Sequence, residues 1–364
     1  MRNPGGLLNR WLVGATARVW AKRTSGSPDA GEKRRVLLVR VDERVGNLLC
    51  MQPIIDVLND VLPGGEIGLL ASGRMEQVAA SLDGVRHLHL IDKRWVFSRP
   101  LKWRGVVRKI RSIAYDTAVD ASSWHEFSYT HAALTYFSGA PVRIGFERSG
   151  APGGVLHSEQ VRPGPAGEYE VAQRLRLLRP LGVKVEQPPP LRTSLGAGKA
   201  VKWREWLSER LGASRWVGLW PGGRKRRNRW NTSGFVEVAR RLLRRVHAVV
   251  CLWGGRDELE LAKSLSNAAG KGCIVAPPTG VADLAGILRN LALFVSNDTG
   301  PMHLAVAVKT PTVAVFTRDE ATRWGHPVPW ARNLHCPGER IEDEVEKIWG
   351  ACLELLSPGD GGNS

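Results

Sequence analysis

Cysteine is scarce in this chain of 364 residues, and its scarcity excludes several kinds of site. The five cysteines are Cys50, Cys251, Cys273, Cys336 and Cys352. They are odd in number and scattered, and none belongs to a Cys-x-x-Cys pair or stands near paired histidines. A disulfide framework or a structural zinc site needs such regular spacing. The sequence therefore predicts a reducing compartment and no structural zinc.

Long hydrophobic runs are also missing. Segment 7–23 mixes leucine, valine and tryptophan with arginine and lysine, and it contains no apolar run of the ~18 residues that a membrane span needs. Arginine also interrupts it before a secretory hydrophobic region could form, so no signal peptide and a cytoplasmic location are predicted. Residues 1–34 are thus a basic tail, either an amphipathic helix on a membrane surface or a partly disordered segment, with a Ser/Gly/Pro linker at 24–32.

Acidic residues are too few to balance the basic ones. The chain has 52 Lys and Arg against 35 Asp and Glu, for a net charge of +17 and an isoelectric point near 10.2. A polyanionic partner is expected, which leaves nucleic acid, an anionic membrane face and a phosphorylated substrate open. The length and the 43% apolar content suit two hydrophobic cores.

The hydrophobic pattern predicts an α/β fold with two Rossmann-like doubly wound domains. Apolar runs at 36–41, 67–70, 87–91 and 117–119 alternate with helical patterns near 75–82, 103–113 and 129–137. A second series of strands follows, with helices between them; the strands are expected at 216–219, 248–252, 274–276, 293–295 and 312–316, and the helices near 235–244, 258–268, 283–289, 302–308 and 345–356. The domains are therefore placed at 35–186 and 198–356, with a triple-proline linker at 187–197 and a tail at 357–364.

The most informative stretch lies near the end of the second series. An apolar run ends at Asp298, and Thr299 and Gly300 open a helix that contains His303. First-turn N–H groups of such a helix lack intrahelical partners and attract anions. The pattern is typical of a phosphate site, although an ordinary turn with Asp298 as a cap and His303 in the core would suit any one of these residues alone.

Taken together, these residues resemble glycosyltransferase family 9, the ADP-heptose lipopolysaccharide heptosyltransferases. The family segment Asp-(Ser/Thr)-Gly-x-x-His-Leu-x-x-Ala and its Pro-Thr strand are matched by Asp298, Thr299, Gly300, His303, Leu304, Ala307, Pro311 and Thr312. Smaller matches occur at 143–146 and 324–327, so the resemblance spans 35 to about 350. It implies a GT-B fold, in which two domains face a cleft, with the acceptor on the first and the nucleotide sugar on the second.

The N-terminal motif departs from the family in two ways. Residues 40–47 resemble Arg-x-Asp-x-x-Gly-Asp, but one extra residue separates Asp42 from Gly46, so Asp42 or Glu43 can occupy the acidic position. Asn47 also replaces the carboxylate expected to act as general base, and an amide cannot accept that proton at neutral pH. Asp42 is the preferred replacement base, Glu43 is the second candidate, and a loop ion pair with arginine is the alternative for Asp42; Asn47 is expected to orient the acceptor.

A glycine and arginine loop follows the first strand of the second domain and resembles the family's Pro-Gly segment. Gly222 and Gly223 allow backbone to approach a ligand, and Lys225 and Arg229 are the preferred contacts to a pyrophosphate. This charge takes the place of a metal, and no Asp-x-Asp motif suggests a divalent ion. A solvated basic loop or a nucleic-acid patch is the alternative for this cluster.

Three further positions are assigned to the nucleotide through the resemblance. Asp257 or Glu258, after a Gly-Gly step, is expected to bind the ribose, and Thr279 to lie near the adenine. A carboxylate at a helix start also serves the helix dipole without any ligand.

The resemblance thus implies an inverting, metal-independent transfer of heptose, or a related sugar, from an ADP-sugar to the lipopolysaccharide inner core. The enzyme is expected to work without a cofactor at the cytoplasmic membrane face, in peripheral contact with anionic lipid and without nucleic acid. A family member with another donor or acceptor, and a non-catalytic sugar-nucleotide or glycan-binding relative, are the alternatives.

Overall fold

The computed structural model describes residues 34–92, 94–125, 127–148, 156–212, 215–246 and 248–357. The basic segment 7–23, the linker 24–32 and most of the tail 357–364 lie outside the described residues. The chain forms two compact units, Met1–Arg44 with Cys50–Pro189, and Val45–Leu49 with Pro190–Ser364. The main division falls inside the triple proline, and one short early segment groups with the second unit.

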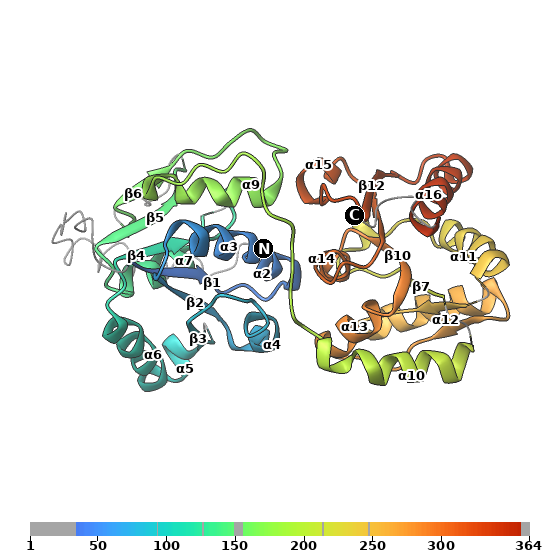
Figure 1. Ribbon diagram of the computed structural model, residues 1–364, viewed down its shortest axis with the longest axis horizontal. Coiled ribbons are helices and arrows are strands. Elements are labelled where there is room, and N and C mark those ends of the chain that lie inside the picture. The colour runs from blue at the N-terminus through green and yellow to red at the C-terminus, as the bar shows by residue number, and fades with distance from the viewer. Residues whose placement is uncertain are drawn as a thin grey trace. The chain divides into compact units, whose positions relative to one another are not determined.

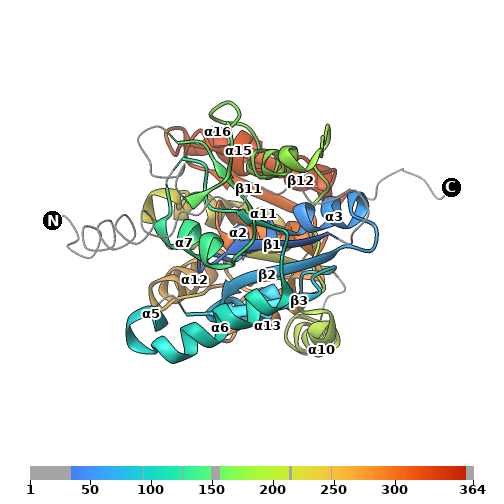
Figure 2. The ribbon, with the colours of Figure 1, turned by 90° about the vertical axis from the view of Figure 1, so that its left-hand side faces the viewer.

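The first unit contains a six-stranded parallel sheet in the order β3-β2-β1-β4-β5-β6 (Figure 1). Its strands are β1 (Arg35–Arg40), β2 (Glu66–Ser72), β3 (His87–Ile91), β4 (Thr117–Asp120), β5 (Val142–Phe146) and β6 (Glu159–Val161). Val36 of β1 is paired with Ile67 on one side and with Thr117 on the other. Residues 36–40 are fully buried because helices cover both faces of this sheet (Figure 2).

Helices and helical turns connect the strands of the first unit. They are α3 (Gln52–Val61), η1 (Gly73–Met75), α4 (Glu76–Ala79), α5 (Trp95–Ser98), α6 (Pro100–Ile113), α7 (Tyr129–Phe137), α9 (Glu170–Leu175) and η2 (Arg176–Leu181). Proline in the first turn of α3 and of α6 suits a position whose N–H has no intrahelical acceptor. One core cluster joins Leu37, Val39, Leu70 and Ile91 of the sheet to Ile110 of α6.

The second unit repeats this architecture in the order β12-β11-β10-β7-β8-β9 (Figure 1). Its strands are β7 (Trp216–Trp220), β8 (Val249–Cys251), β9 (Cys273–Val275), β10 (Leu291–Asn297), β11 (Thr312–Phe316) and β12 (Ala331–His335). In both sheets the chain first builds outward on one side of its first strand and then crosses to the other side. Ligands of such sheets bind where the order reverses, outside the carboxyl ends of the strands. These points lie between β1 and β4 and between β7 and β10.

Ten helices or helical turns are described in the second unit. They are α2 (Val45–Leu49), η3 (Ala197–Lys199), α10 (Ala200–Leu211), η4 (Arg226–Asn228), α11 (Thr232–Val246), α12 (Arg256–Ala269), α13 (Val281–Leu288), α14 (Gly300–Ala307), α15 (Ala321–Trp324) and α16 (Ile341–Leu356). A large core cluster joins α11 and α16 to the sheet, with Phe235, Val238 and Leu242 on the buried side of α11.

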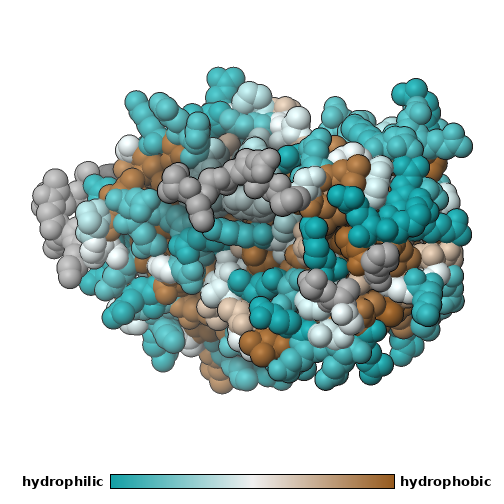
Figure 3. All heavy atoms as spheres, turned by 45° about the vertical axis from the view of Figure 1, so that its right-hand side comes forward, coloured by the Kyte–Doolittle hydropathy of each residue, from teal (hydrophilic) through white to brown (hydrophobic). Residues whose placement is uncertain are grey.

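The predicted α/β class with two doubly wound units is confirmed. Helix α7 and strands β3 and β11 begin and end where the pattern predicted. Two of the four edge strands, β6 and β12, were not predicted, and neither were strand β5 and helix α10. None of the helices in the described ranges is long and apolar enough to cross a membrane. Hydrophilic residues cover most of the face in Figure 3, with hydrophobic residues in separate groups between them.

Candidate functional site

The strand order places a candidate site between β7 and β10 of the second unit. The segment Pro221–Gly223 follows β7, and Asp298 follows β10, which is the neighbouring strand. Because all strands of this sheet are parallel, both segments leave the sheet at the same edge. The two motifs singled out in the sequence therefore meet at the point where a ligand is expected.

Asn297, the last residue of β10, ties the two segments together. Its side chain is fully buried; its Nδ2 donates to the carbonyl oxygens of Pro221 (2.8 Å) and Gly222 (3.0 Å), and its Oδ1 accepts from the N–H of Trp230 (2.9 Å). One amide thus satisfies three buried backbone groups and fixes both ends of the glycine and arginine loop. The sequence interpretation missed this residue, although it precedes Asp298 directly.

Asp298 is a carboxyl group held in a protein environment that disfavours its charge. Burial, with the neighbouring carboxylate of Glu320, raises its pKa to about 6, and Lys225 and a hydrogen bond from Asn228 oppose the shift only in part. The Nδ2 of Asn228 donates to Asp298 Oδ2 at 3.0 Å. A carboxyl group that titrates near neutrality in a loop at a switch point is a functional candidate. Asn228 was also missed in the sequence.

The N-terminus of α14 offers fewer anion-binding donors than its sequence suggested. Pro301 has no N–H, and the N–H of Met302 donates to the carbonyl oxygen of Thr299 at 3.1 Å. The hydroxyl of Thr299 donates to the Asn297 carbonyl oxygen at 3.2 Å, so it holds the turn. The N–H of Gly300 is therefore the main first-turn donor that the helix retains for a ligand.

His303 lies on the buried side of α14. It is 6% exposed, its Nδ1 lies 2.6 Å from His326 Nε2, and it contacts the Trp324 ring edge-on. Burial and the second histidine lower the pKa of His326 well below its ordinary value, so at neutral pH this ring is uncharged. The burial of His303 and its ring contacts match the alternative in which this residue packs in the core.

Helix α2 also lies against His303. A Cβ on Gly46 would stand 2.2 Å from His303 Cδ2, so only glycine permits this approach. A Cβ on Gly300 would lie 3.6 Å from that of Val45. Asn47, the next residue of α2, is 5% exposed. The second unit therefore brings Gly46 and Asn47 of the N-terminal motif to the Asp298–His303 segment.

The glycine and arginine loop has one structural cation and several exposed ones. Arg229 Nε donates to the Gly223 carbonyl oxygen at 2.7 Å, and its Nη2 pairs with Asp257 at 2.6 Å. Arg229 therefore shapes the loop, while Lys225 is exposed and acts electrostatically on Asp298. The remaining cations of the loop are also exposed; they are Arg224, Arg226 and Arg227.

The two carboxylates proposed for the ribose differ in environment. Asp257 is 60% exposed and engaged by Arg229, which holds the pKa of that carboxyl below its ordinary value. Glu258 is 8% exposed; its Oε2 accepts from the N–H of Gly254 at 2.9 Å, and its carboxyl group packs on Gly222. Glu258 thus supports the loop, and Asp257 is the more accessible of the two. Thr279 lies half-buried in the loop after β9.

The two acidic residues after β1 belong to the first unit, and each pairs with an arginine. Asp42 Oδ2 lies 2.6 Å from Nη2 of the buried Arg40, and its Oδ1 accepts from the N–H of Arg44. Glu43 pairs with Arg74 at 3.3 Å. The Asp42 side chain remains 26% exposed, so the ion pair orients this carboxylate without removing it from solvent.

The first unit also has a buried polar cluster beside its own switch point. Asp120, at the end of β4, accepts from His157 Nε2 at 3.1 Å, and both side chains are fully buried. Burial disfavours the Asp120 charge, yet His157, His131 and Ser122 outweigh it and lower the pKa. His131 Nε2 in turn accepts from the N–H of Val41. The sequence offered no motif for this cluster.

Within the described ranges, no group of three or more His, Cys, Asp or Glu side chains has the geometry of a metal site. The described cations and polar groups of the second unit nevertheless converge on one sheet edge. The cations at such an edge can bind an anionic group, and Asp298 can accept hydrogen bonds from hydroxyl groups of a ligand.

Comparisons with known proteins give one answer. Residues 103–348 match the family model "Glycosyltransferase family 9 (heptosyltransferase)", a span that does not include Asp42 or Asn47. Lipopolysaccharide heptosyltransferase 3 of Escherichia coli K12 is 22% identical over 299 residues, which are 79% of this chain and 83% of that protein.

Solved structures agree on the fold. The family 9 glycosyltransferase of Veillonella parvula superposes with a TM-score of 0.75 at 18% identity, covering 89% of this chain and 97% of that one. The E. coli heptosyltransferase WaaC, in a structure with ADP, gives 0.67 at 20% identity over 88% and 99%. The predicted GT-B fold class is confirmed by these neighbours.

Proposed function

Because the chain belongs to glycosyltransferase family 9, we propose that it moves a heptose, or a related sugar, from an ADP-sugar to the inner core of lipopolysaccharide, with inversion at the anomeric carbon. The relatives that it resembles are lipopolysaccharide heptosyltransferases, and one neighbouring structure contains ADP. The donor, the acceptor and the stereochemistry are the parts of this proposal that experiment must test.

The observation that carries the proposal is the composition of the switch point between β7 and β10. Asp298 supplies a hydrogen-bond acceptor for sugar or ribose hydroxyl groups. Gly222 and Gly223 let Glu258 and Thr299 pack closely against the loop that carries the cations. Exposed Lys225 and the arginines beside it supply charge for a pyrophosphate. Preorganised cations that meet the charge developing on a departing nucleotide lower the barrier without a metal. We therefore place the donor at this edge.

The general base is assigned to the first unit. The Asp42 side chain is partly exposed, and its ion pair with Arg40 fixes its orientation. In the proposed step the acceptor hydroxyl loses its proton to Asp42 as its oxygen attacks the anomeric carbon, and the ADP leaves on the opposite face. Glu43 is the second candidate for the base. Asn47 hydrogen-bonds the acceptor and takes no proton.

The location follows from the acceptor. A lipid-linked core sugar is held at a membrane face, so the protein is proposed to work in the cytoplasm in peripheral contact with anionic lipid. The net charge of +17 favours such contact. Nucleic acid is not proposed as a partner, because its binding would leave the arrangement around Asp298 without a role.

The decisive experiment is transfer from ADP-heptose to a truncated lipopolysaccharide core by the purified protein, with and without EDTA. Donor binding is measured in parallel by calorimetry. Transfer that survives EDTA supports the full proposal, and transfer lost with EDTA contradicts metal independence. Absence of both binding and transfer contradicts the ADP-heptose assignment, and other nucleotide sugars then test a different donor.

A second candidate is a sugar-nucleotide or glycan-binding relative without turnover. It is favoured by Asn47, which replaces the expected carboxylate, and by the ion pair that engages Asp42. Donor binding without transfer to a series of core acceptors would support this candidate. An Asn47→Asp variant that gained transfer activity would show that only the base is missing.

A further inference from the structure

Helix α6 presents an unusual outer face to solvent. Its inner side packs Trp103, Val106, Ile110 and Ile113 into the core of the first unit, beside the edge strand β3. The other side carries Leu101, which is 80% exposed and is the most exposed of the large hydrophobic residues in the described ranges. The helix therefore has one buried stripe and one solvent face with a hydrophobic residue at its start.

The solvent face of α6 is strongly basic. The 14 residues include five cations and no Asp or Glu; the cations are Lys102, Arg104, Arg108, Lys109 and Arg111. Arg111 donates to the Phe137 carbonyl oxygen. In the part of the chain that the structure describes, none of the other four forms an ion pair with a carboxylate, while the Lys102 ammonium lies 5.6 Å from the centre of the Trp95 ring. These four cations and Leu101 are called the α6 face below.

Helix stability does not explain these charges. Lys102 stands in the first turn, where the positive end of the helix dipole repels it. Arg104 and Arg108 are four residues apart on one side, a spacing at which like charges repel. The charges therefore weaken the helix that carries them, which is expected only if they serve an interaction outside it.

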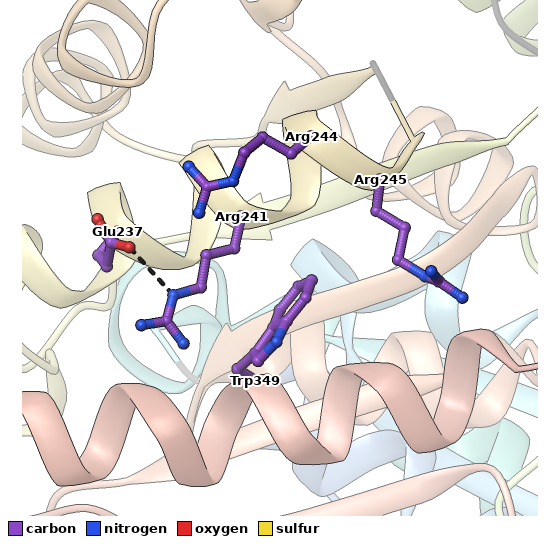
Figure 4. Close-up of a pocket in the computed structure, with 5 residues that line it drawn as sticks. All are labelled: Glu237, Arg241, Arg244, Arg245 and Trp349. Carbon is purple, nitrogen blue, oxygen red and sulfur yellow. Dashed lines mark hydrogen bonds and ion pairs between the residues drawn. The ribbon is translucent and has the colours of Figure 1, made fainter.

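A second basic cluster has a structural explanation. A surface hollow in the second unit is lined by Glu237, Arg241, Arg244, Arg245 and Trp349 (Figure 4). Arg241 pairs with Glu237 at 3.0 Å and with Glu346 at 2.7 Å. Arg244 and Arg245 lie in the last turn of α11, where cations complement the dipole. This cluster therefore serves as a matched control.

We infer that the α6 face docks the protein on an anionic phospholipid bilayer, with Leu101 inserted between headgroups and the four cations on lipid phosphates. A basic helix with an apolar residue beside its charges suits the membrane interface, where each cation contributes about a fivefold change in partitioning. The inference deepens the proposed function, since a lipid-linked acceptor gives the contact its purpose. The binding itself requires neither donor nor acceptor.

The test is cosedimentation of the full chain with vesicles of phosphatidylcholine alone and with 30% phosphatidylglycerol, at fixed ionic strength. The wild type should bind the anionic vesicles and not the neutral ones. The double variant Arg108→Gln/Lys109→Gln should lower partitioning at least tenfold, and Leu101→Ser should lower it severalfold. Arg244→Gln/Arg245→Gln removes the same charge elsewhere and should stay within twofold of the wild type.

Three results would overturn the inference. The first is an equal loss in the α6 and α11 double variants, which would indicate net charge without a defined surface. The second is binding that the α6 substitutions leave unchanged, which would place the contact elsewhere. The third is absence of vesicle binding together with tight, α6-dependent binding of an RNA homopolymer. Circular dichroism of each variant checks that the helix is retained.

Transfer activity separates this inference from the proposed function. A delipidated core acceptor in solution needs no membrane, so α6 variants should use it as well as the wild type does. Vesicle binding without any transfer would contradict the proposed function alone. Transfer to the soluble acceptor without α6-dependent vesicle binding would contradict this inference alone.

Discussion

Asp298→Asn is predicted to stabilise the protein near neutral pH. The substitution preserves the size of the side chain and keeps an oxygen to accept the hydrogen bond from Asn228. It removes the negative charge that burial and Glu320 disfavour. A stabilising substitution at a proposed ligand site is the expected mark of a residue retained for function at a cost in stability.

The size of the effect follows from the pKa. The folded state raises the pKa of Asp298 from 3.8 to about 6, so it binds a proton more tightly than the unfolded chain does. The free energy of unfolding therefore falls as the pH rises from about 3.8 to about 6, and it is lower by about 3 kcal/mol above pH 6. The Asn variant should gain up to about 3 kcal/mol at pH 7.5 and only about 1 kcal/mol at pH 4.5.

Urea unfolding of both proteins at the two pH values measures this difference. Asp257→Asn is a suitable control, because Arg229 lowers the pKa of the exposed Asp257 and its loss should not stabilise the protein at pH 7.5. Equal stability of wild type and Asp298→Asn at pH 7.5, or a gain in stability that does not depend on pH, would refute the conclusion that the folded protein disfavours the negative charge of Asp298.

The same site should respond in donor binding. Asp298→Ala removes the proposed acceptor for donor hydroxyl groups and should weaken donor affinity about tenfold or more in calorimetry. Donor affinity that does not change would remove Asp298 from the proposed donor site while leaving the stability prediction intact.

Three further predictions concern the proposed base and the loop. Asp42→Asn should lower kcat at least a hundredfold with donor affinity retained, and unchanged turnover would exclude Asp42 as the base. Asn47→Asp should raise turnover several-fold if the chemical step limits the rate, and a slower variant would indicate that the amide is required. Gly222→Ala should lower stability by about 1–3 kcal/mol in thermal unfolding, because the new Cβ would stand 2.7 Å from Glu258 Cδ. A melting temperature equal to that of the wild type would show that the loop shifts to accommodate the methyl group.

Much of the fold was predictable because its central strands are apolar on both faces. Short apolar runs such as 36–39 and 312–316 are typical of strands that are buried on both faces of a parallel sheet. The edge strands β6 and β12 contain polar residues that face solvent, so their sequences resemble loops. Helix α10 buries only Trp203 and Leu207, and its apolar stripe is too narrow to stand out.

The site was predictable where local sequence order fixes it. Asp298, Thr299 and Gly300 follow a strand and open a helix, which is a local pattern. Asn297 acts through backbone groups 67 to 76 residues away, and no local pattern reveals such contacts. The same limit applies to Asp120 and His157, whose pairing across 37 residues depends on the sheet.

The assignment of Val45–Leu49 to the second unit has a consequence for synthesis of the chain. On the ribosome, α2 is made early, but the α14 segment against which Gly46 packs follows roughly 250 residues later. At about 5–20 residues per second, some tens of seconds separate the two. During this time α2, whose residues 46–49 are buried in the folded protein, lacks the α14 surface that covers Gly46. Nascent chains that end before residue 300 should therefore engage chaperones through this segment.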